Sequence, residues 1–154
     1  MKYDEQTLLH LTKSLKSYDR MVFRSRMLVM LTEMCLIVTS LKTTEKLLSR
    51  FSGKTPTPDA KEAFIILDRY QTAFNLLKQS DGLKGRCLSQ SLVMRLLLKR
   101  KGIYTDLKIG ITQVNGKFDA HAWLEKGGVL INDHPSVIAN YLVLPENRKH
   151  IRIN

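Results

Sequence analysis

Cysteine is scarce in this chain, which has only Cys35 and Cys87 among its 154 residues. Neither cysteine belongs to a CxxC motif or to a cysteine–histidine pair with zinc-finger spacing, so we expect no structural zinc site and no disulfide framework. A chain of this length can bury a sizeable core without such cross-links. We therefore expect a single globular domain over residues 1–154.

The chain also lacks a long hydrophobic run. Its longest apolar stretch, residues 27–41, is interrupted by Thr32 and Glu33, and it is shorter than the roughly 20 residues that a membrane-spanning helix needs. The polar N-terminus has no signal-peptide pattern. We expect a cytoplasmic protein without stable membrane insertion, whose thiols stay reduced and available for chemistry.

Acidic residues are few, since 14 aspartates and glutamates stand against 25 lysines and arginines, for a formal net charge of +11. Such a charge favours an acidic partner. The basic residues form no run interleaved with aromatic side chains, so we expect no nucleic acid as the partner. The simplest interpretation is a solvated basic surface, which could help to recruit an acidic peptide or protein.

The first half of the chain has the apolar periodicity of helices. We expect one amphipathic helix around residues 8–15 and a longer one over about 19–49. A third helix is predicted from Pro58 to about Lys78, with Thr57 as its N-cap.

The long second helix carries Cys35, which we expect to fill the core like most cysteines in an apolar stripe. Three methionines lie nearby, Met27, Met30 and Met34. They could form a partner-binding surface, but core packing is the favoured interpretation.

A buried helix is predicted from Cys87 to Arg100, because leucine, valine and methionine surround most of its circumference. The rest of the chain has strand character. Residues 104–114 and 118–125 flank an Asn-Gly turn, and residues 129–133 form a further strand. Residues 141–144 could add a short strand or a helical turn.

This order of elements, helices first and then an antiparallel meander, predicts an α+β fold. We expect a helical front part, residues 1–80, packed on a core, residues 81–154. The core would contain the central Cys-bearing helix and an antiparallel sheet.

Cys87 is placed for nucleophilic chemistry at the start of the buried helix. A helix N-terminus stabilises a thiolate through its dipole and its free backbone N–H groups, and Arg86 adds positive charge nearby. The same N–H groups can hold the oxyanion of a tetrahedral intermediate. A cysteine so placed predicts a nucleophile.

His121 lies on the strand 118–125, whose odd-numbered side chains, including Trp123, are expected to face a cleft while the even-numbered ones face the core. If the following turn has three residues, 126–128, then His121 and Asp133 lie directly opposite each other. The carboxylate could then orient the imidazole. A register shifted by one residue would break this pairing.

Alternatives to this constellation stay open. Asp119 and Glu125 are further acids on the face of His121. A single cysteine, histidine or aspartate is more often structural than catalytic. Metal ligation by His121, Asp133 and His134 would match no strong metal motif, so we expect no metal.

Two segments resemble the lasso-peptide leader peptidases, which are transglutaminase-like cysteine proteases of ribosomal peptide biosynthesis. The first is Gly85–Leu92, with the sequence GRCLSQSL, and the second is Asp119–Glu125, with the sequence DAHAWLE. The resemblance covers about residues 80–135, and the helical front part fits the stand-alone form of this family. Gln90 departs from the family, which often has a basic residue at that position.

The resemblance implies a transglutaminase- or papain-like core over residues 81–154, and it implies a role for each candidate. Cys87 would be the nucleophile, His121 the general base and then acid, and Asp133 the residue that orients the imidazole, while Trp123 is a candidate substrate-binding residue. No cofactor is implied. The implied partners are the precursor peptide with its leader, a separate leader-recognition protein, and the synthetase that forms the macrolactam.

Three other functions compete with this peptidase. A transglutaminase-like amide-bond transferase would keep the three residues but pass the acyl group to an amine instead of water. A non-catalytic basic binding module would not need Cys87 at all. A structural assembly subunit would use the methionines around residues 27–34 as its interface.

Overall fold

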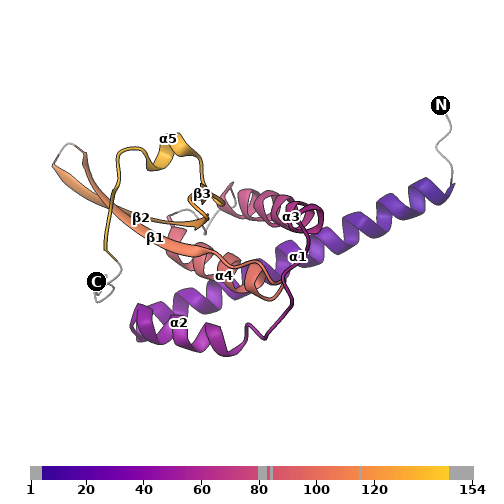
Figure 1. Cartoon of the computed structure of the whole chain (residues 1–154), viewed down its shortest axis with the longest axis horizontal. Helices are drawn as coiled ribbons and strands as arrows, with labels where there is room; N and C mark the ends of the chain where they lie inside the picture. The colour runs from indigo at the N-terminus through magenta and orange to yellow at the C-terminus, as the bar shows by residue number, and fades with distance from the viewer. Residues whose placement is uncertain (1–4, 80–82, 84, 115, 146–154) are drawn as a thin grey trace.

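The computed structural model describes residues 5–79, 83, 85–114 and 116–145, and all of their side chains except those of residues 5–15 and 114. Helices form the first part of the chain, and a four-stranded antiparallel sheet follows (Figure 1). The α+β fold predicted from the sequence is confirmed. The elements are α1 (Glu5–Val38), α2 (Leu41–Arg50), α3 (Ala60–Gln79), α4 (Cys87–Lys99), β1 (Asp106–Val114), β2 (Lys117–Lys126), β3 (Val129–Leu130), α5 (Pro135–Ile138) and β4 (Leu142–Val143).

Helix α1 is continuous over 34 residues, where two helices with a break near residues 16–18 were expected. That segment contains neither glycine nor proline, so nothing in it ends a helix. The break falls instead at Thr39 and Ser40. Thr39 Oγ1 donates to the Cys35 carbonyl at the end of α1 (2.8 Å), and Ser40 Oγ accepts from the Thr43 backbone N–H at the start of α2 (3.3 Å). The side chains of the expected first helix, residues 8–15, lie outside the described part.

The outward face of α1 corrects a second expectation. Met27, Met30 and Met34 are 44%, 47% and 64% exposed, so they do not pack in the core, and Cys35 is only partly buried. The opposite face packs on the protein, through Val22, Ser25, Leu28, Val29, Thr32 and Leu36. Within the described residues, neither α1 nor any other helix combines the length and apolarity needed to cross a bilayer.

Helix α3 begins at Ala60, and its N-cap is Asp59 instead of the predicted Thr57. The Asp59 carboxylate accepts a hydrogen bond from the Glu62 backbone N–H at 2.8 Å, and the Asp59 carbonyl accepts the first helical bond from Ala63. A carboxylate three residues before the free N–H group satisfies the helix start.

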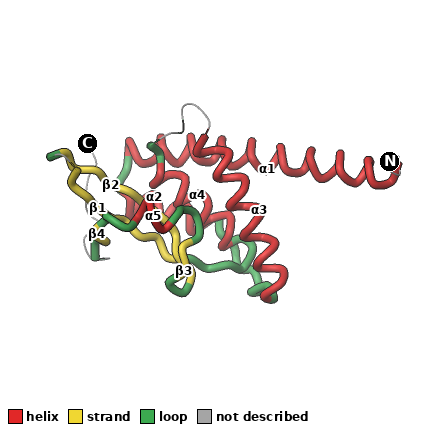
Figure 2. Tube along the Cα trace, turned by 90° about the horizontal axis from the view of Figure 1, so that it is seen from above, coloured by secondary structure: helices red, strands yellow, loops and turns green. Residues whose placement is uncertain are grey.

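Helix α4 is the centre of the fold, as predicted. It packs against α1, α2, α3, β1 and β2, and Figure 1 shows it between the sheet and α1. Figure 2 shows α1, α3 and α4 gathered on one side of the sheet. The residues of α4 that are buried in the core include Leu92, Val93, Met94 and Leu98.

The sheet has the strand order β3-β2-β1-β4. β2 pairs with β3 through Glu125 opposite Leu130 and Lys126 opposite Val129. The turn between them therefore has two residues, Gly127 and Gly128, and not the three that were predicted. Both glycines have positive φ angles of 57° and 80°, which a two-residue hairpin turn requires.

The face prediction for β2 is half correct. Ala122 and Leu124 lie in the core as expected, but Phe118 is 78% exposed and Ala120 is also exposed. The β1–β2 hairpin extends away from the helices at its tip (Figure 1), which agrees with the exposure of these positions. Of the turn at this tip, Asn115 lies outside the described residues and Gly116 has a positive φ of 77°.

Candidate active site

Cys87 is the first residue of α4 and is partly buried. The preceding Arg86 makes no side-chain hydrogen bond to the helix start, so the first N–H groups of α4 have no side-chain cap. Gly85 has a positive φ of 77°, which turns the chain into the helix. The helix start thus leaves its positive end and its N–H groups beside the thiol.

His121 faces this thiol from β2. Its Nε2 lies 2.6 Å from Asp133 Oδ2, and the two side chains are 18% and 9% exposed. The imidazole also shares a hydrogen bond with Cys87, whose Sγ lies 4.0 Å from the Ala120 carbonyl. Because Nε2 is engaged by Asp133, Nδ1 is the nitrogen left for the thiol. The three predicted residues therefore lie together.

Asp133 reaches His121 by a different route from the one predicted. The register of β3 is shifted by one residue, so a regular ladder would not place Asp133 opposite His121. The chain leaves the ladder after Ile131, whose N–H donates to the Leu124 carbonyl at 2.8 Å. The Asn132 side chain, and not a backbone carbonyl, then accepts from the Leu124 N–H at 2.7 Å. This bend brings Asp133 to the imidazole.

The electrostatics of the site favour a charged pair. Burial raises the pKa of the Cys87 thiol, but the hydrogen bond to His121 and the backbone N–H groups of Ala122 and Leu88 together bring it below its ordinary value. Hydrogen bonds to Asp133 and Cys87 raise the pKa of His121 to about 9, although burial opposes them. At neutral pH this arrangement favours a thiolate beside an imidazolium.

The other acids considered for the site have different partners. Asp119 accepts from the Tyr141 hydroxyl at 2.5 Å and from the Ala120 N–H at 3.0 Å. Glu125 accepts from the Trp123 indole N–H at 2.8 Å. Asp133 is thus the acid in contact with His121.

Histidine 134, considered above as a metal ligand, has a local structural contact. Its Nδ1 lies 2.7 Å from the Ser136 hydroxyl and accepts from the Ser136 backbone N–H, so His134 caps α5.

The sequence profile of one family matches residues 28–146, more than half of the chain, and includes all three site residues. The chain belongs to the transglutaminase-like superfamily. The resemblance seen in the sequence is thus confirmed at the level of the superfamily, which is consistent with a cysteine hydrolase or transferase. No curated protein and no solved structure matches the chain significantly.

Lys78, at the end of α3, supports the transglutaminase-like site from the helical part of the chain. Its Nζ donates to Asp133 Oδ2 at 3.2 Å and to the Asn132 carbonyl at 2.5 Å. Burial raises the pKa of Asp133, but the hydrogen bond from His121 and the charge of Lys78 lower it by more. Asp133 is therefore an ionised carboxylate with two cationic neighbours. The sequence offered no signal for Lys78, which looks like an ordinary helix-end lysine.

A buried polar junction lies beneath the site and joins its three elements. Ser91, one turn after Cys87 on α4, donates to the Ala122 carbonyl of β2 at 3.0 Å. Asn132 donates through Nδ2 to Ser91 Oγ at 2.9 Å and accepts from Leu124. Each member thus lies next to, or one helical turn from, a predicted site residue. The junction fixes the spacing of α4, β2 and the Asp133 loop.

Trp123 supports the site from inside instead of lining a cleft. Its side chain is only 1% exposed, which contradicts its predicted contact with substrate. The ring lies 6.2 Å from the His121 ring and 6.4 Å from that of Tyr141. A Cβ atom added at Gly110 would come within 2.8 Å of Trp123 and of Tyr141. Only glycine leaves room for this cluster beside the imidazole.

Tyr141 was missed by the sequence analysis, although it is the aromatic residue that closes over His121, with ring centroids 5.5 Å apart. The hydrogen bond to Asp119 raises the pKa of Tyr141 to about 12. The phenol therefore stays protonated at neutral pH. Its position in the loop before β4 depends on pairing between strands that are far apart in the sequence, which no local sequence pattern predicts.

Gln90 holds the turn that precedes the nucleophile. It is 2% exposed, and its Nε2 donates to the Leu83 carbonyl at 2.8 Å. Its Oε1 has no hydrogen-bond partner within the described residues. The position that departs from the leader-peptidase pattern therefore has a structural contact in this chain.

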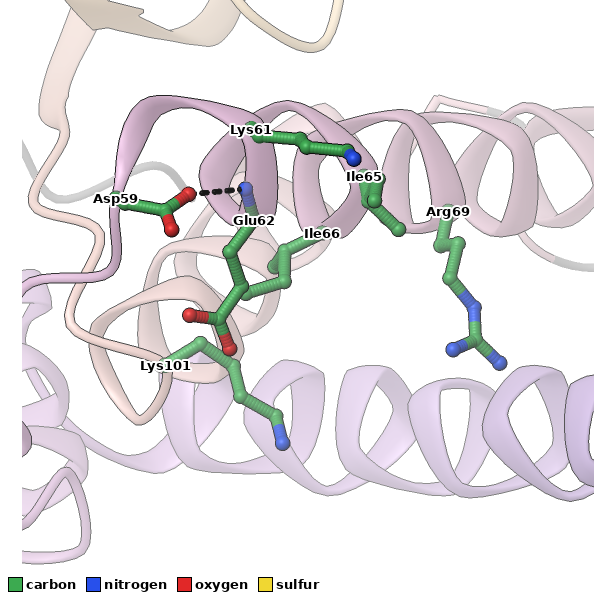
Figure 3. Close-up of a pocket in the computed structure, with 7 residues that line it drawn as sticks. All are labelled: Asp59, Lys61, Glu62, Ile65, Ile66, Arg69 and Lys101. Carbon is green, nitrogen blue, oxygen red and sulfur yellow. Dashed lines mark hydrogen bonds between the residues drawn. The ribbon is translucent and has the colours of Figure 1, made fainter.

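Two open pockets lie apart from this site. One, of about 400 Å³, lies at the start of α3 (Figure 3). It is lined by Asp59, Lys61, Glu62, Ile65, Ile66, Arg69 and Lys101. A second, of about 390 Å³, lies beside Arg95 and Glu45, which form an ion pair at 2.9 Å. We place the chemistry at Cys87, because these pockets hold no nucleophile with an activating base.

Proposed function

We propose that this protein is a cysteine peptidase that removes the leader from a ribosomally made lasso-peptide precursor. The observation that carries the chemistry is the contact of His121 with both Cys87 and Asp133. Superfamily membership supports a cysteine hydrolase or transferase. The choice of a lasso precursor rests on the resemblance of GRCLSQSL and DAHAWLE to the leader peptidases.

In the proposed reaction, the Cys87 thiolate attacks the carbonyl carbon of the peptide bond at the leader–core junction. The backbone N–H groups at the start of α4 are the candidates for holding the oxyanion. Protonated His121 then gives its proton to the leaving amine, which becomes the new N-terminus of the core peptide. A thioester remains between the leader and Cys87.

Water resolves this thioester in the second half of the proposed reaction. His121, now neutral, takes a proton from the water as it attacks, and the Cys87 thiolate leaves. Asp133 acts through His121, because its carboxylate keeps the proton-bearing Nε2 in place and stabilises the imidazolium. No cofactor enters these steps.

The proposal includes three partners and a cytoplasmic setting that keeps the thiol reduced. The leader peptide is the substrate, a separate leader-recognition protein delivers it, and a macrolactam synthetase uses the amine that cleavage frees. The net charge of +11 favours association with an acidic leader or partner. If the recognition protein delivers the substrate, cleavage is expected to be faster in its presence. Equal cleavage rates with and without the recognition protein would contradict this role.

The test is to incubate the protein with a lasso-type precursor and its leader-binding protein in water enriched in oxygen-18. Hydrolysis predicts a leader fragment whose new carboxylate carries the heavy isotope, and a core fragment with a free amine. An amide-bond transferase, the second enzyme on this scaffold, would instead give a leader joined to an added amine. Equal processing by the Cys87→Ala variant would contradict both and favour a non-catalytic binding module.

A further inference from the structure

Helix α1 carries an exposed apolar stripe on the side away from the core. The outer stripe consists of Phe23, Met27, Met30, Met34 and Ile37, which are 65%, 44%, 47%, 64% and 78% exposed. These side chains are large and apolar, yet nothing in the described part of the chain covers them. Exposed contiguous apolar surface of this kind marks an interaction site.

The spacing of the residues in the outer stripe indicates that the partner that covers it is a helix. Its residues follow one another at intervals of four, three, four and three, an average of 3.5 residues. This is the repeat of helices that pack side by side, because it keeps one narrow seam facing a partner helix. Leu31 and Val38, 54% and 79% exposed, widen the seam on one flank. The stripe therefore fits another helix of similar apolar pattern.

The charges beside the outer stripe are complementary to those of a second copy. Arg26 and Glu33 are seven residues apart on the same flank of the stripe. In an antiparallel pair centred between residues 28 and 29, Arg26 of each copy lies within one helical turn of Glu33 of the other. The centre also places Phe23 against Met34 and Met27 against Met30. A parallel pair would instead bring Arg20 of one copy against Arg20 of the other.

We propose that α1 pairs with α1 of a second copy as an antiparallel two-helix seam. Two Arg26–Glu33 pairs fix the register, and antiparallel helix dipoles add to the attraction. The net charge of +11 on each copy opposes the association at low salt. Cys87, His121 and Asp133 lie outside the stripe, so this inference does not depend on the proposed peptidase activity.

Sedimentation equilibrium of the full chain over a range of concentrations, in buffer near physiological salt, tests the proposal. A monomer–dimer equilibrium is expected for the wild type. Met30→Glu, at the centre of the stripe, is expected to abolish the dimer. Phe64→Glu is the matched control, because Phe64 is 72% exposed on α3 but lies outside the stripe.

Charge reversal distinguishes the specific pairs from general repulsion. Arg26→Glu and Glu33→Arg are each expected to weaken the dimer roughly tenfold, and the double variant is expected to restore it. Arg26→Glu lowers the net charge from +11 to +9, so general repulsion alone predicts a tighter dimer for this variant. A tighter dimer, or a double variant without rescue, would overturn the proposal.

Disulfide trapping tests the direction of the helices. In a background without Cys35 and Cys87, a mixture of Met27→Cys and Met30→Cys chains is expected to cross-link to each other faster than either does to itself. Faster self-linking of Met30→Cys would mean a parallel pair and overturn the proposal. It is likewise overturned if the wild type stays monomeric at all concentrations, including the case in which it binds anionic lipid vesicles instead.

Discussion

Helices α1 and α4 have similar apolar sequences but opposite surroundings. Both are rich in leucine, and each contains methionine and one cysteine. α4 is enclosed by three helices and two strands, so even its polar residues Ser89, Gln90 and Ser91 are buried. α1 packs with one face only, and the face of its methionines is open.

The comparison shows that the role of an apolar helix depends on the elements packed around it and not on its composition. Around α4, the neighbours supply hydrogen-bond partners for a thiol, and its pKa falls. On α1, the same residue types form a surface without chemistry. Substitutions in matched pairs, one at the α4 site and one elsewhere, can break or sharpen this contrast.

The largest expected effect separates the two cysteines. Cys87→Ala removes the nucleophile and is expected to lower precursor cleavage by roughly 10⁴-fold or more. Cys35→Ala is expected to change the rate little, because Cys35 lies on α1 away from His121 and Asp133. Turnover followed by mass spectrometry checks both variants. If Cys35→Ala were inactive and Cys87→Ala still active, Cys35 and not Cys87 would be the nucleophile.

The next effect separates two acids near His121. Asp133→Asn is expected to lower kcat/KM by roughly 100-fold or more, because the imidazolium loses its carboxylate partner. The pKa of His121, now about 9, then falls, and the alkaline limb of the pH profile moves to lower pH. Asp119→Asn, which affects the bond to Tyr141, is expected to stay within a few-fold. Equal losses and equal pH profiles for the two variants would count against Asp133 as the orienting residue.

Much of the site follows from local sequence patterns. Periodicity, glycine turns and the two segments that resemble the leader peptidases predict three features. These are the helix from Cys87, the strand of His121 and the position of Asp133 after a short strand. The sequence does not show how the helix, the strand and the Asp133 segment contact one another. The predicted register was wrong by one residue, and the contact is made through a bend at Asn132 that no pairing rule anticipates.

The supporting residues were missed for the same reason. Lys78, Ser91, Asn132 and Tyr141 act through contacts between distant segments, and each looks ordinary in its local sequence. The expectation that the methionines of α1 pack in the core was wrong for a different reason. Their helical periodicity is clear, but periodicity alone does not say which of two apolar faces packs inward.

A stability measurement then compares the buried junction with the outer stripe. Asn132→Ala leaves the Leu124 N–H and the Ser91 hydroxyl without their partner, and two such losses are expected to cost roughly 2–4 kcal/mol of unfolding free energy. Met34→Ala, at a position 64% exposed, is expected to cost about 0.5 kcal/mol or less. Urea denaturation at low protein concentration checks both values. A larger cost for Met34→Ala would contradict the contrast between a packed junction and an open stripe.

A smaller effect is expected from Gly110→Ala on β1. The added methyl group meets Trp123 and the Tyr141 Cβ at 2.8 Å, so both rings must shift, at a cost of roughly 1–3 kcal/mol. Because Trp123 lies beside His121, Cys87 alkylation is also expected to slow. Thermal unfolding and alkylation rates measured on the same sample check this. Unchanged values for both would show that the aromatic cluster does not support the imidazole.

The most direct test of the central claim is the alkylation of Cys87 and Cys35 by iodoacetamide across pH, read by peptide mass spectrometry in the wild type and in His121→Ala. The thiolate–imidazolium pair predicts fast reaction of Cys87 well below pH ~8.5, the region of an ordinary thiol. It also predicts that this reactivity moves to higher pH when His121 is removed, while that of Cys35 does not change. A Cys87 profile that is the same with and without His121 would contradict the account.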